Sequence, residues 1–248
     1  MKILAIETTG KYGSAALIDD EGRIYSAETH DGMDHLRELI GTVDKTLKEA
    51  GCEKSELTHV AASVGPGSFT GIRIGVTAAR TFAQMLDIPC IGVSSLTGMA
   101  LRVLEDAEGK ACNVVCSIIN ARRHQAYAGA WGMTNGTVFP LLEEKQYMIE
   151  EVIEKLKPFG RIYFTGDGVD AYDVIIEESD IGTRVEFAPE EIRYQHASTV
   201  AGLALIKADA GEIVDYDELL PEYMRLAEAE QRLKEGTLSD KISKLTGK

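Results

Sequence analysis

The amino-terminal half of the chain begins with three short strand-like runs and then alternates between helix-like and strand-like segments. Turn-forming glycines and aspartates separate the three runs, which are residues 3–6, 14–18 and 23–26. The segments that follow read as a helix over 35–50, a strand over 58–64, a helix over 71–86, a strand over 90–93 and a helix from about 94. Hairpins join antiparallel strands and helical crossovers join parallel ones. This βββαβαβα order therefore predicts an α/β fold whose sheet has an antiparallel edge and a parallel interior.

The remaining sequence follows a less regular order of strands and helices. We expect strands over 113–119, 125–131, 138–147 and 161–165, and helices over 150–157, 168–178 and 197–210, followed by a charged helical tail over 223–234. Acidic residues and Gly109 cluster just before this half. We therefore divide the chain into an N-terminal lobe, residues 1–108, and a C-terminal lobe, residues 109–248. The 197–210 helix is expected to pack back toward the first lobe.

The charge balance limits the partners that the chain can hold by itself. Forty acidic and 26 basic side chains give a formal net charge of −14, and an acidic surface repels nucleic-acid backbones. We find no basic stripe that would offset this repulsion. No apolar run approaches the roughly 18 residues that cross a bilayer, so we expect no membrane partner and a cytoplasmic location.

The 71–86 helix carries more apolar surface than packing against one neighbour requires. Its apolar residues cover an arc of roughly 200°, whereas a helix packed on one side needs about 100°. Within the arc, small residues recur at every fourth position, namely Gly71, Gly75, Ala79 and Ala83. A helix buried on all sides of its own molecule would explain the pattern. The sharper interpretation is that another chain approaches along these small residues.

Two glycine-containing turns have the composition of anion-binding loops. The first joins the first two strands, and its candidate phosphate-binding residues are Glu7, Thr8, Thr9, Gly10, Gly13 and Ser14. Ordinary hairpin chemistry would explain the same residues. The second turn, residues 65–71, precedes the 71–86 helix and either binds an anion at the helix N-terminus or only connects strand and helix. It lacks the Gly-Lys-Ser/Thr ending of a P-loop.

Residue patterns typical of catalytic centres are missing from the sequence. The five histidines form no H-x-x-x-H or H-E-x-x-H pair, and no serine lies in G-x-S-x-G. We therefore predict no catalytic residue and no metal ligand. Arg122, Arg123 and His124 are expected at a β-turn, either as solvated charges or as a local contact for a phosphate or a partner.

Several motifs together resemble one bacterial family. They are Ile3-Leu4-Ala5-Ile6-Glu7-Thr8-Thr9, the string G-P-G-S-F-T-G-I-R-I-G at 65–75, Ile91-Gly92-Val93-Ser94-Ser95-Leu96, Asn120-Ala121-Arg122-Arg123, Gly166-Asp167-Gly168 and Pro221-Glu222-Tyr223-Met224-Arg225. The chain resembles the TsaB (YeaZ) family of the pathway that makes threonylcarbamoyladenosine in tRNA. This resemblance implies the two-lobed, ribonuclease H-like ASKHA fold of actin, Hsp70 and sugar kinases, with a degenerate second lobe.

The resemblance also implies a set of partners. The catalytic paralogue TsaD would form a heterodimer with the chain through the 35–50 and 71–86 helices. The expected interface residues are His35, Leu39, Gly71, Ile72, Gly75, Val76, Ala79 and Ala83. The ATPase TsaE would join this pair, a TsaC-type enzyme would act in the same pathway, and tRNA would bind only through the complex. Without its partner, the chain could form a homodimer through the same face.

Departures from the family pattern bear on cofactors. TsaD-type proteins carry an H-x-x-x-H metal pair where this chain has Ser95-Leu96-Thr97-Gly98-Met99. Glu7 and Asn120 each replace an aspartate that is usual in the family. We expect no cofactor on the isolated chain, and ATP or ADP and a metal held mainly by partner subunits.

Two hypotheses of function follow. In the first, the chain is a non-catalytic scaffold subunit of the complex that modifies A37 of tRNA. In the second, it is an ASKHA-type ATPase or phosphotransferase that acts alone through the turn from Glu7 to Ser14.

Overall fold

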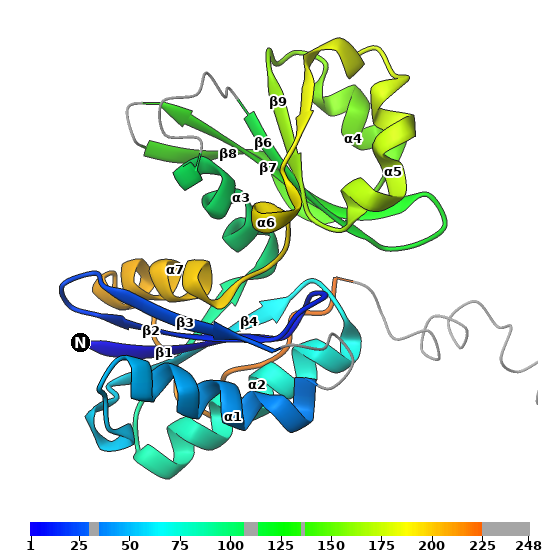
Figure 1. The fold of residues 1–248 in the computed structure, drawn as a ribbon. Coiled ribbons are helices and arrows are strands. Elements are labelled where there is room, and N and C mark those ends of the chain that lie inside the picture. The colour runs from blue at the N-terminus through cyan, green and yellow to red at the C-terminus, as the bar shows by residue number, and fades with distance from the viewer. Residues whose placement is uncertain (30–34, 107–113, 135–136, 225–248) are drawn as a thin grey trace, which may run out of the picture.

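The computed structural model describes residues 1–29, 35–106, 114–134 and 137–224. These residues form two lobes, each built on a five-stranded sheet with helices on both faces (Figure 1). The strands of the first sheet are β1 (Lys2–Glu7), β2 (Ser14–Asp19), β3 (Ile24–Glu28), β4 (His59–Gly65) and β5 (Cys90–Ser94). The strands of the second sheet are β6 (Val114–Asn120), β7 (Gln125–Thr134), β8 (Thr137–Met148), β9 (Ile162–Thr165) and β10 (Val185–Phe187).

The first sheet has the order β3-β2-β1-β4-β5. The two hairpins pair β1 with β2 and β2 with β3 in antiparallel fashion, whereas β4 runs parallel to both β1 and β5. The predicted combination of an antiparallel edge and a parallel interior is confirmed. The two-lobed α/β fold class expected from the sequence is confirmed as well.

Both faces of the first sheet are covered by helices. Helices α1 (His35–Glu49) and α2 (Phe69–Leu86) cover one face, and α7 (Ala197–Asp209) covers the other (Figure 1). Side chains alternate along β1, so that Leu4 and Ile6 pack beneath α1 and α2 while Ile3 and Ala5 pack beneath α7. This double burial explains why β1 is apolar without interruption from Ile3 to Ile6.

The second sheet has the order β10-β9-β6-β7-β8 and is also covered on both faces. Helices α4 (Ile149–Leu156) and α5 (Gly168–Glu177) pack on one side, and α3 (Ser95–Asp106) packs on the other, near the short helix α6 (Glu190–Arg193). Along β6, Cys116 and Ile118 face α4 and α5, whereas Val115 and Ile119 face α3. The chain then returns to the first lobe, where α7 contacts β1 and β2.

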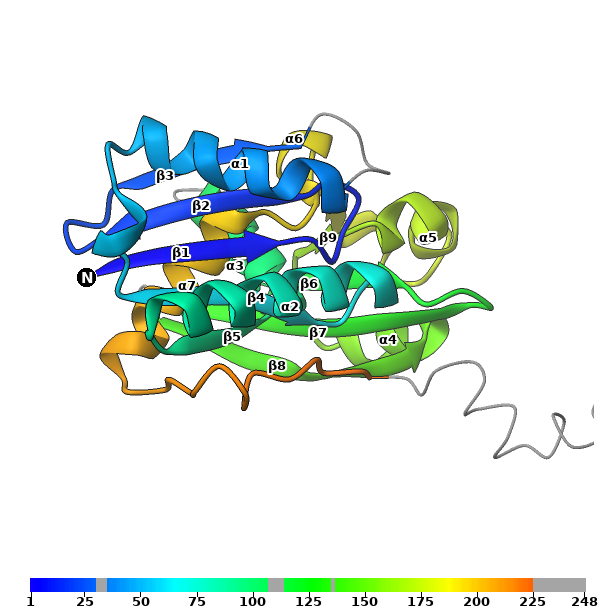
Figure 2. The same cartoon turned by 90° about the horizontal axis from the view of Figure 1, so that it is seen from below.

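After α7, residues 211–224 run along the outer edge of β5 and back toward the start of α2, and we call them the strap (Figure 2). The backbones of Val214 and Cys90 exchange two hydrogen bonds, of 2.8 and 2.9 Å. Leu219 is buried in the core beneath α2, and the Glu222 amide donates to the Val64 carbonyl at 2.8 Å. The strap is thereby fixed to the first lobe along its length.

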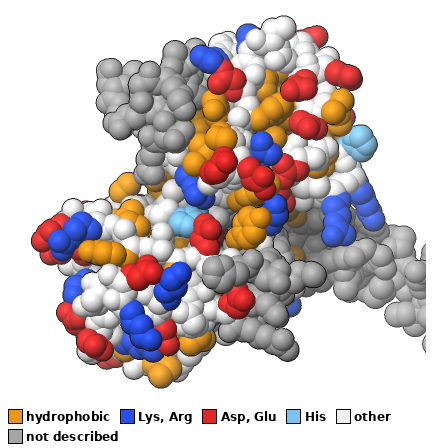
Figure 3. Space-filling view, viewed as in Figure 1, with side chains coloured by type: hydrophobic (Ala, Val, Ile, Leu, Met, Phe, Trp, Pro, Cys, Tyr) orange, Lys and Arg blue, Asp and Glu red, His pale blue; other side chains and the backbone are white. Residues whose placement is uncertain are grey.

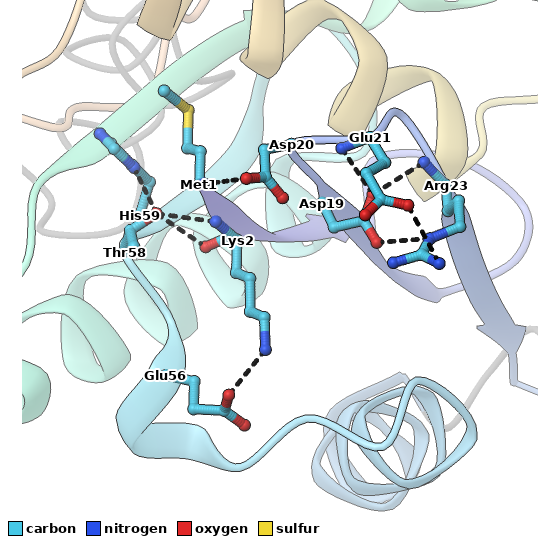
Figure 4. Close-up of polar contacts among 9 residues, drawn as sticks. All are labelled: Met1, Lys2, Asp19, Asp20, Glu21, Arg23, Glu56, Thr58 and His59. Atoms are coloured by element: carbon cyan, nitrogen blue, oxygen red, sulfur yellow. Dashed lines mark hydrogen bonds and ion pairs between the residues drawn. The ribbon is translucent and has the colours of Figure 1, made fainter.

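Polar contacts fix the edge of the first lobe where the chain begins (Figure 4). The Asp19 carboxylate accepts hydrogen bonds from the backbone amides of Glu21 and Arg23, both at 3.0 Å, which closes the β2–β3 turn. The Arg23 side chain also pairs with this carboxylate at 2.8 Å. Lys2 pairs with Glu56 at 2.7 Å, and this contact ties β1 to the short turn before β4.

The expected elements agree with the structure within a few residues at each end. β10 and α6 were not predicted from the sequence, because they span only three and four residues and are too short to show a periodicity. The proposed lobe boundary at residues 108 and 109 and most of the expected 223–234 helix lie outside the described residues. Within the described residues, no helix has the length and apolar character needed to cross a membrane.

Candidate functional site

A cleft of about 930 Å³ lies between the lobes. The first lobe contributes the β1–β2 turn and the start of α2, and the second lobe contributes the β6–β7 turn and the residues before α5. The lining residues that could bind a ligand through polar groups are Thr9, Lys11, Ser68, Thr70, Asn120, Arg122, Arg123, Asp167 and Asp170. The cleft therefore brings the two turns singled out in the first lobe together with the Arg-Arg-His turn of the second.

Only part of the predicted phosphate loop faces this cleft. Thr9 and Gly10 line it. Thr8 is buried and its hydroxyl donates to the Gly71 carbonyl at 2.7 Å. The Gly13 amide donates to the Thr29 hydroxyl, and the Ser14 hydroxyl accepts from the Ala197 amide at 2.9 Å. Thr8, Gly13 and Ser14 therefore hold the lobe together rather than offering free groups to a phosphate.

Glu7 is folded into the protein interior, where its side chain is only 1% exposed. One carboxylate oxygen accepts from the amide and the hydroxyl of Thr9, at 2.5 and 2.7 Å, and the other accepts from the Ser63 hydroxyl. Burial raises the pKa of this carboxyl group, although the hydrogen bonds from Ser63 and Thr9 oppose the shift. A metal ion held beside a bound phosphate needs an accessible carboxylate oxygen, whereas both Glu7 oxygens are buried and hydrogen-bonded. The first hairpin therefore does not fit a metal-bound nucleotide.

The β6–β7 turn has an unusual backbone. Arg122, Arg123 and His124 have positive φ angles of 64°, 55° and 61°. Non-glycine residues adopt this left-handed conformation at a cost of roughly 1–2 kcal/mol each, and such strain often concentrates at functional sites. The expectation of a β-turn at these residues is confirmed, and the Gln125 amide closes it by donating to the Arg122 carbonyl at 3.0 Å.

Metal-ligating side chains do not gather anywhere in the described part of the chain. No group of three or more His, Cys, Asp or Glu residues in those ranges has the arrangement of a metal site. Asp167, in the cleft wall, is half-buried, and desolvation raises the pKa of its carboxyl group. Its Oδ1 atom accepts from the Asn120 amide at 3.0 Å.

The structure corrects the prediction that the small residues of the 71–86 helix meet another chain. That prediction was wrong for Gly71, Ile72, Gly75, Val76, Ala79 and Ala83, which are all buried within their own lobe. The physical reason is close packing of α2 on β4 and on Thr8, which follows β1. A Cβ atom on Gly75 would lie 2.5 Å from Thr8 Oγ1, and one on Gly71 would overlap the Thr8 carbonyl. The two glycines of this groove therefore pack against Thr8 of the same chain.

The two other expected interface residues lie on α1. Leu39 is 2% exposed and belongs to the same core, so most of its side chain serves the fold. It does reach the floor of the surface groove described next. His35 begins α1, but its side chain lies outside the described part of the structure.

The other half of the apolar arc on α2 faces outward and forms a groove of about 510 Å³ with α1. Its apolar lining consists of Leu39, Ile40, Ile74, Ala78, Phe82 and Met85. Met85 is 79% exposed and Ile40 is 52% exposed, while Ile74 and Phe82 are half-buried. Lys54, Arg73, Thr77 and Thr81 complete the lining. The apolar periodicity of α2 correctly indicated two contact faces. The face of small residues was expected to lie on the surface, but the face that does so is the one that carries Met85.

An aromatic cluster lies at one end of this groove. The rings of Phe69 and Tyr223 stack with centroids 4.1 Å apart and planes 4° from parallel. The Arg73 guanidinium lies over both rings, and its Nε donates to the Tyr223 hydroxyl at 2.9 Å. Because Arg73 also lines the groove, the strap and the groove share a residue. No sequence pattern identified this contact, which joins positions 150 residues apart.

Comparison with known proteins gives matches over nearly the whole chain. The sequence model of a family described as TsaD, tRNA N6-adenosine threonylcarbamoyltransferase, matches residues 30–233. The tRNA threonylcarbamoyladenosine biosynthesis protein TsaB of Bacillus subtilis is 32% identical over 234 residues, covering 94% of this chain and 97% of that protein. The protein of the same name from Escherichia coli is 26% identical and covers 91% of this chain and 95% of its own length.

Solved structures also match this chain over most of its length. YeaZ from Pseudomonas aeruginosa superimposes with a TM-score of 0.75 at 25% identity, covering 90% of this chain and 99% of that structure. Component A of (R)-2-hydroxyglutaryl-CoA dehydratase from Acidaminococcus fermentans superimposes with a TM-score of 0.50 at 11% identity, over 84% of this chain and 99% of that one. The second likeness concerns the fold alone.

Proposed function

Because this chain belongs to the TsaB family of tRNA threonylcarbamoyladenosine biosynthesis proteins, we propose that it is a scaffold subunit of the complex that modifies A37 of tRNA. In this role it pairs with the catalytic paralogue TsaD and supports binding of the ATPase TsaE, while a TsaC-type enzyme supplies the activated intermediate. The complex works in the cytoplasm, and tRNA reaches the chain only as part of that complex.

The outward apolar face of α1 and α2 is the observation that carries this proposal. Exposed Met85 and Ile40 flank half-buried Phe82 and Ile74, so the groove offers a continuous apolar surface that partner binding would remove from water. The TsaD family model matches this chain, so the two proteins share an architecture. Paralogues of one fold can pair through equivalent faces about a pseudo-twofold axis. The same face would allow the chain to form a homodimer when TsaD is missing.

The chain's own chemistry favours a scaffold over an ATPase that acts alone. Glu7 is buried, hydrogen-bonded on both oxygens and has a raised pKa, so it is a poor ligand for a metal-bound water. We therefore place ATP or ADP and the metal mainly on the partner subunits.

Size-exclusion chromatography of the chain mixed with its TsaD tests the proposal, with one variant on each face of α2. Met85→Glu puts a carboxylate into the apolar groove and should weaken the 1:1 complex about a hundredfold or more, because burying an unpaired charge costs several kcal/mol. Gln84→Glu adds the same charge on the exposed surface of α2 outside the groove lining and should leave the complex intact. A Met85→Glu protein that folds and binds as tightly as the wild type would overturn the assigned surface.

A further inference from the structure

The β6–β7 turn is held in its left-handed conformation by a specific set of hydrogen bonds. Asn120 Oδ1 accepts from the Arg122 amide at 2.8 Å and lies 3.0 Å from the Tyr172 hydroxyl. That hydroxyl also lies 2.9 Å from the Gln125 carbonyl on the other side of the turn. The Asn120 amide in turn donates to Asp167. The turn is therefore anchored to α5 and the residues before it.

The side chains of this turn point away from the interior. Arg122, Arg123 and His124 are all exposed, and the β6–β7 hairpin projects from the second lobe at the right of Figures 1 and 2. Basic side chains and a histidine gather at the same edge in Figure 3. Within the described ranges, neither guanidinium has an ion pair or a side-chain hydrogen bond. Two adjacent arginines are thus presented to solvent on a chain whose net charge is −14.

The turn also forms one wall of the cleft between the lobes. Across the cleft lie the Lys11 side chain and the residues that begin α2, including Ser68 and Thr70. Tyr127 and Phe69 also line the cleft, with one face of the Phe69 ring stacked on Tyr223, and the aspartates Asp167 and Asp170 lie in the same lining. The phosphates of a nucleic-acid strand pair with exposed basic side chains such as these two arginines. A guanidinium matches the geometry of a phosphate with two parallel hydrogen bonds.

We propose that the Arg122–Arg123–His124 turn is a contact for the phosphate backbone of RNA, made by this chain within the assembled complex. The inference rests on the proposed function, which supplies an RNA substrate. An RNA strand suits the site better than a free nucleotide, because the arginines lie at a projecting tip and the buried Glu7 leaves a metal–triphosphate group without its carboxylate. The acidic remainder of the chain repels RNA, so the turn contributes to binding only beside the basic surfaces of partner subunits.

The salt dependence of RNA binding by the complex with TsaD tests the inference. The logarithm of the RNA association constant falls linearly with the logarithm of the salt concentration. Each phosphate contact that is lost makes this negative slope shallower by about 0.7 to 0.9. The double variant Arg122→Gln/Arg123→Gln should therefore reduce the slope by about 1.4 to 1.8 and weaken tRNA binding about tenfold near physiological salt. Fluorescence anisotropy of labelled tRNA at several KCl concentrations measures both quantities.

A matched control removes the same charge elsewhere on the second lobe. Lys145 and Lys155 are exposed and lie outside the cleft lining, and Lys145→Gln/Lys155→Gln should leave the slope as in the wild-type complex. Equal slopes for the arginine variant and the wild type, with both complexes assembled on size-exclusion chromatography, would overturn the inference alone. A wild-type chain that forms no complex with TsaD would instead overturn the proposed function.

Calorimetry of the isolated chain with Mg-ATP tests whether the phosphate that the turn binds belongs to RNA or to a free nucleotide. We expect no saturable binding by the wild-type chain. Saturable ATP binding that disappears in the arginine double variant would assign the turn to a nucleotide and would overturn the RNA contact.

Discussion

Gly75 on α2 lies directly against Thr8, just after the end of β1: a Cβ atom at Gly75 would come within 2.5 Å of the Thr8 hydroxyl oxygen. That hydroxyl is itself fixed, since it donates to the Gly71 carbonyl at 2.7 Å. The closeness of helix and strand therefore depends on glycine at position 75. A substitution there acts on the fold before it can act on any partner.

Gly75→Ala should lower the free energy of unfolding by about 1–3 kcal/mol, because the added methyl group overpacks a rigid contact. Gly202→Ala on α7 is the control, since nothing lies within 4 Å of a Cβ there. It should be neutral or stabilising by up to about 1 kcal/mol, the helix preference of alanine over glycine. Urea denaturation measures both, and equal midpoints for Gly75→Ala and the wild type would contradict the packing described.

Two adjacent leucines of the strap should differ strongly in the stability lost when each is truncated to alanine. Leu219 is 2% exposed and Leu220 is 60% exposed. Leu219→Ala should cost about 2–5 kcal/mol through lost burial and a residual cavity, whereas Leu220→Ala should change stability by no more than about 0.5 kcal/mol. Denaturant unfolding of the two variants side by side checks this, and similar losses in both would mean that the strap is not anchored through Leu219.

Glu7→Gln should change how stability depends on pH. Burial raises the pKa of the Glu7 carboxyl, so the folded chain holds this proton more tightly than the unfolded chain does. The resulting stabilisation is complete below the unfolded pKa, near 4.5, and is lost as pH rises through the folded value. Glutamine stays neutral, so the variant should gain stability relative to the wild type as pH rises above 4.5. Thermal melts from pH 4.5 to 8 measure this, with exposed Glu49→Gln as control. Parallel curves for Glu7→Gln and the wild type would refute it.

His196, which caps the N-terminus of α7, should make the chain sensitive to acid. Burial lowers the pKa of its imidazole to about 4, and the nearby positive charge of Arg102 acts in the same direction. The Glu28 carboxylate, whose Oε1 lies 2.9 Å from His196 Nε2, acts to raise this pKa. The unfolded chain therefore binds this proton more readily. The stability that neutral His196 contributes is present above pH 6.5 and is lost as pH falls from 6.5 toward 4.

The variant His196→Asn keeps a capping side chain but removes the titrating group. Its loss of stability between pH 7 and pH 4 should be smaller than that of the wild type in thermal melts. His124→Asn, at an exposed position with positive φ that asparagine tolerates, should follow the wild-type curve. A wild-type curve that is flat between pH 6.5 and 4 would argue against the buried neutral histidine.

Sequence reasoning recovered most of the architecture because the patterns involved are local. Strand length, the turns between β1, β2 and β3 and the spacing of apolar residues in α1 and α2 each depend on a few neighbouring positions. Together they predicted the direction of strands in the first sheet, with an antiparallel edge and a parallel interior, but not their order across the sheet. The regular alternation of strand and helix left few other ways to connect them.

Which neighbour covers which helix face is a tertiary property, and it was predicted less well. The periodicity of α2 identified an arc wide enough for two contacts, yet it could not show that Gly75 meets Thr8 while Met85 faces outward. The hydrogen bonds that occupy Glu7 come from Thr9 and Ser63, and the latter lies on another strand. The stack of Tyr223 on Phe69 likewise joins distant segments.

The strap also affects how molecules of this chain meet each other. β5 is the outermost parallel strand of the first sheet, and an uncovered outer strand can template intermolecular β-pairing and aggregation. Val214 occupies the backbone groups of Cys90, and the Lys207 side chain donates to the Gly92 carbonyl at 3.0 Å. The chain thus shields its own sheet border, and this shielding discourages strand-to-strand polymerisation.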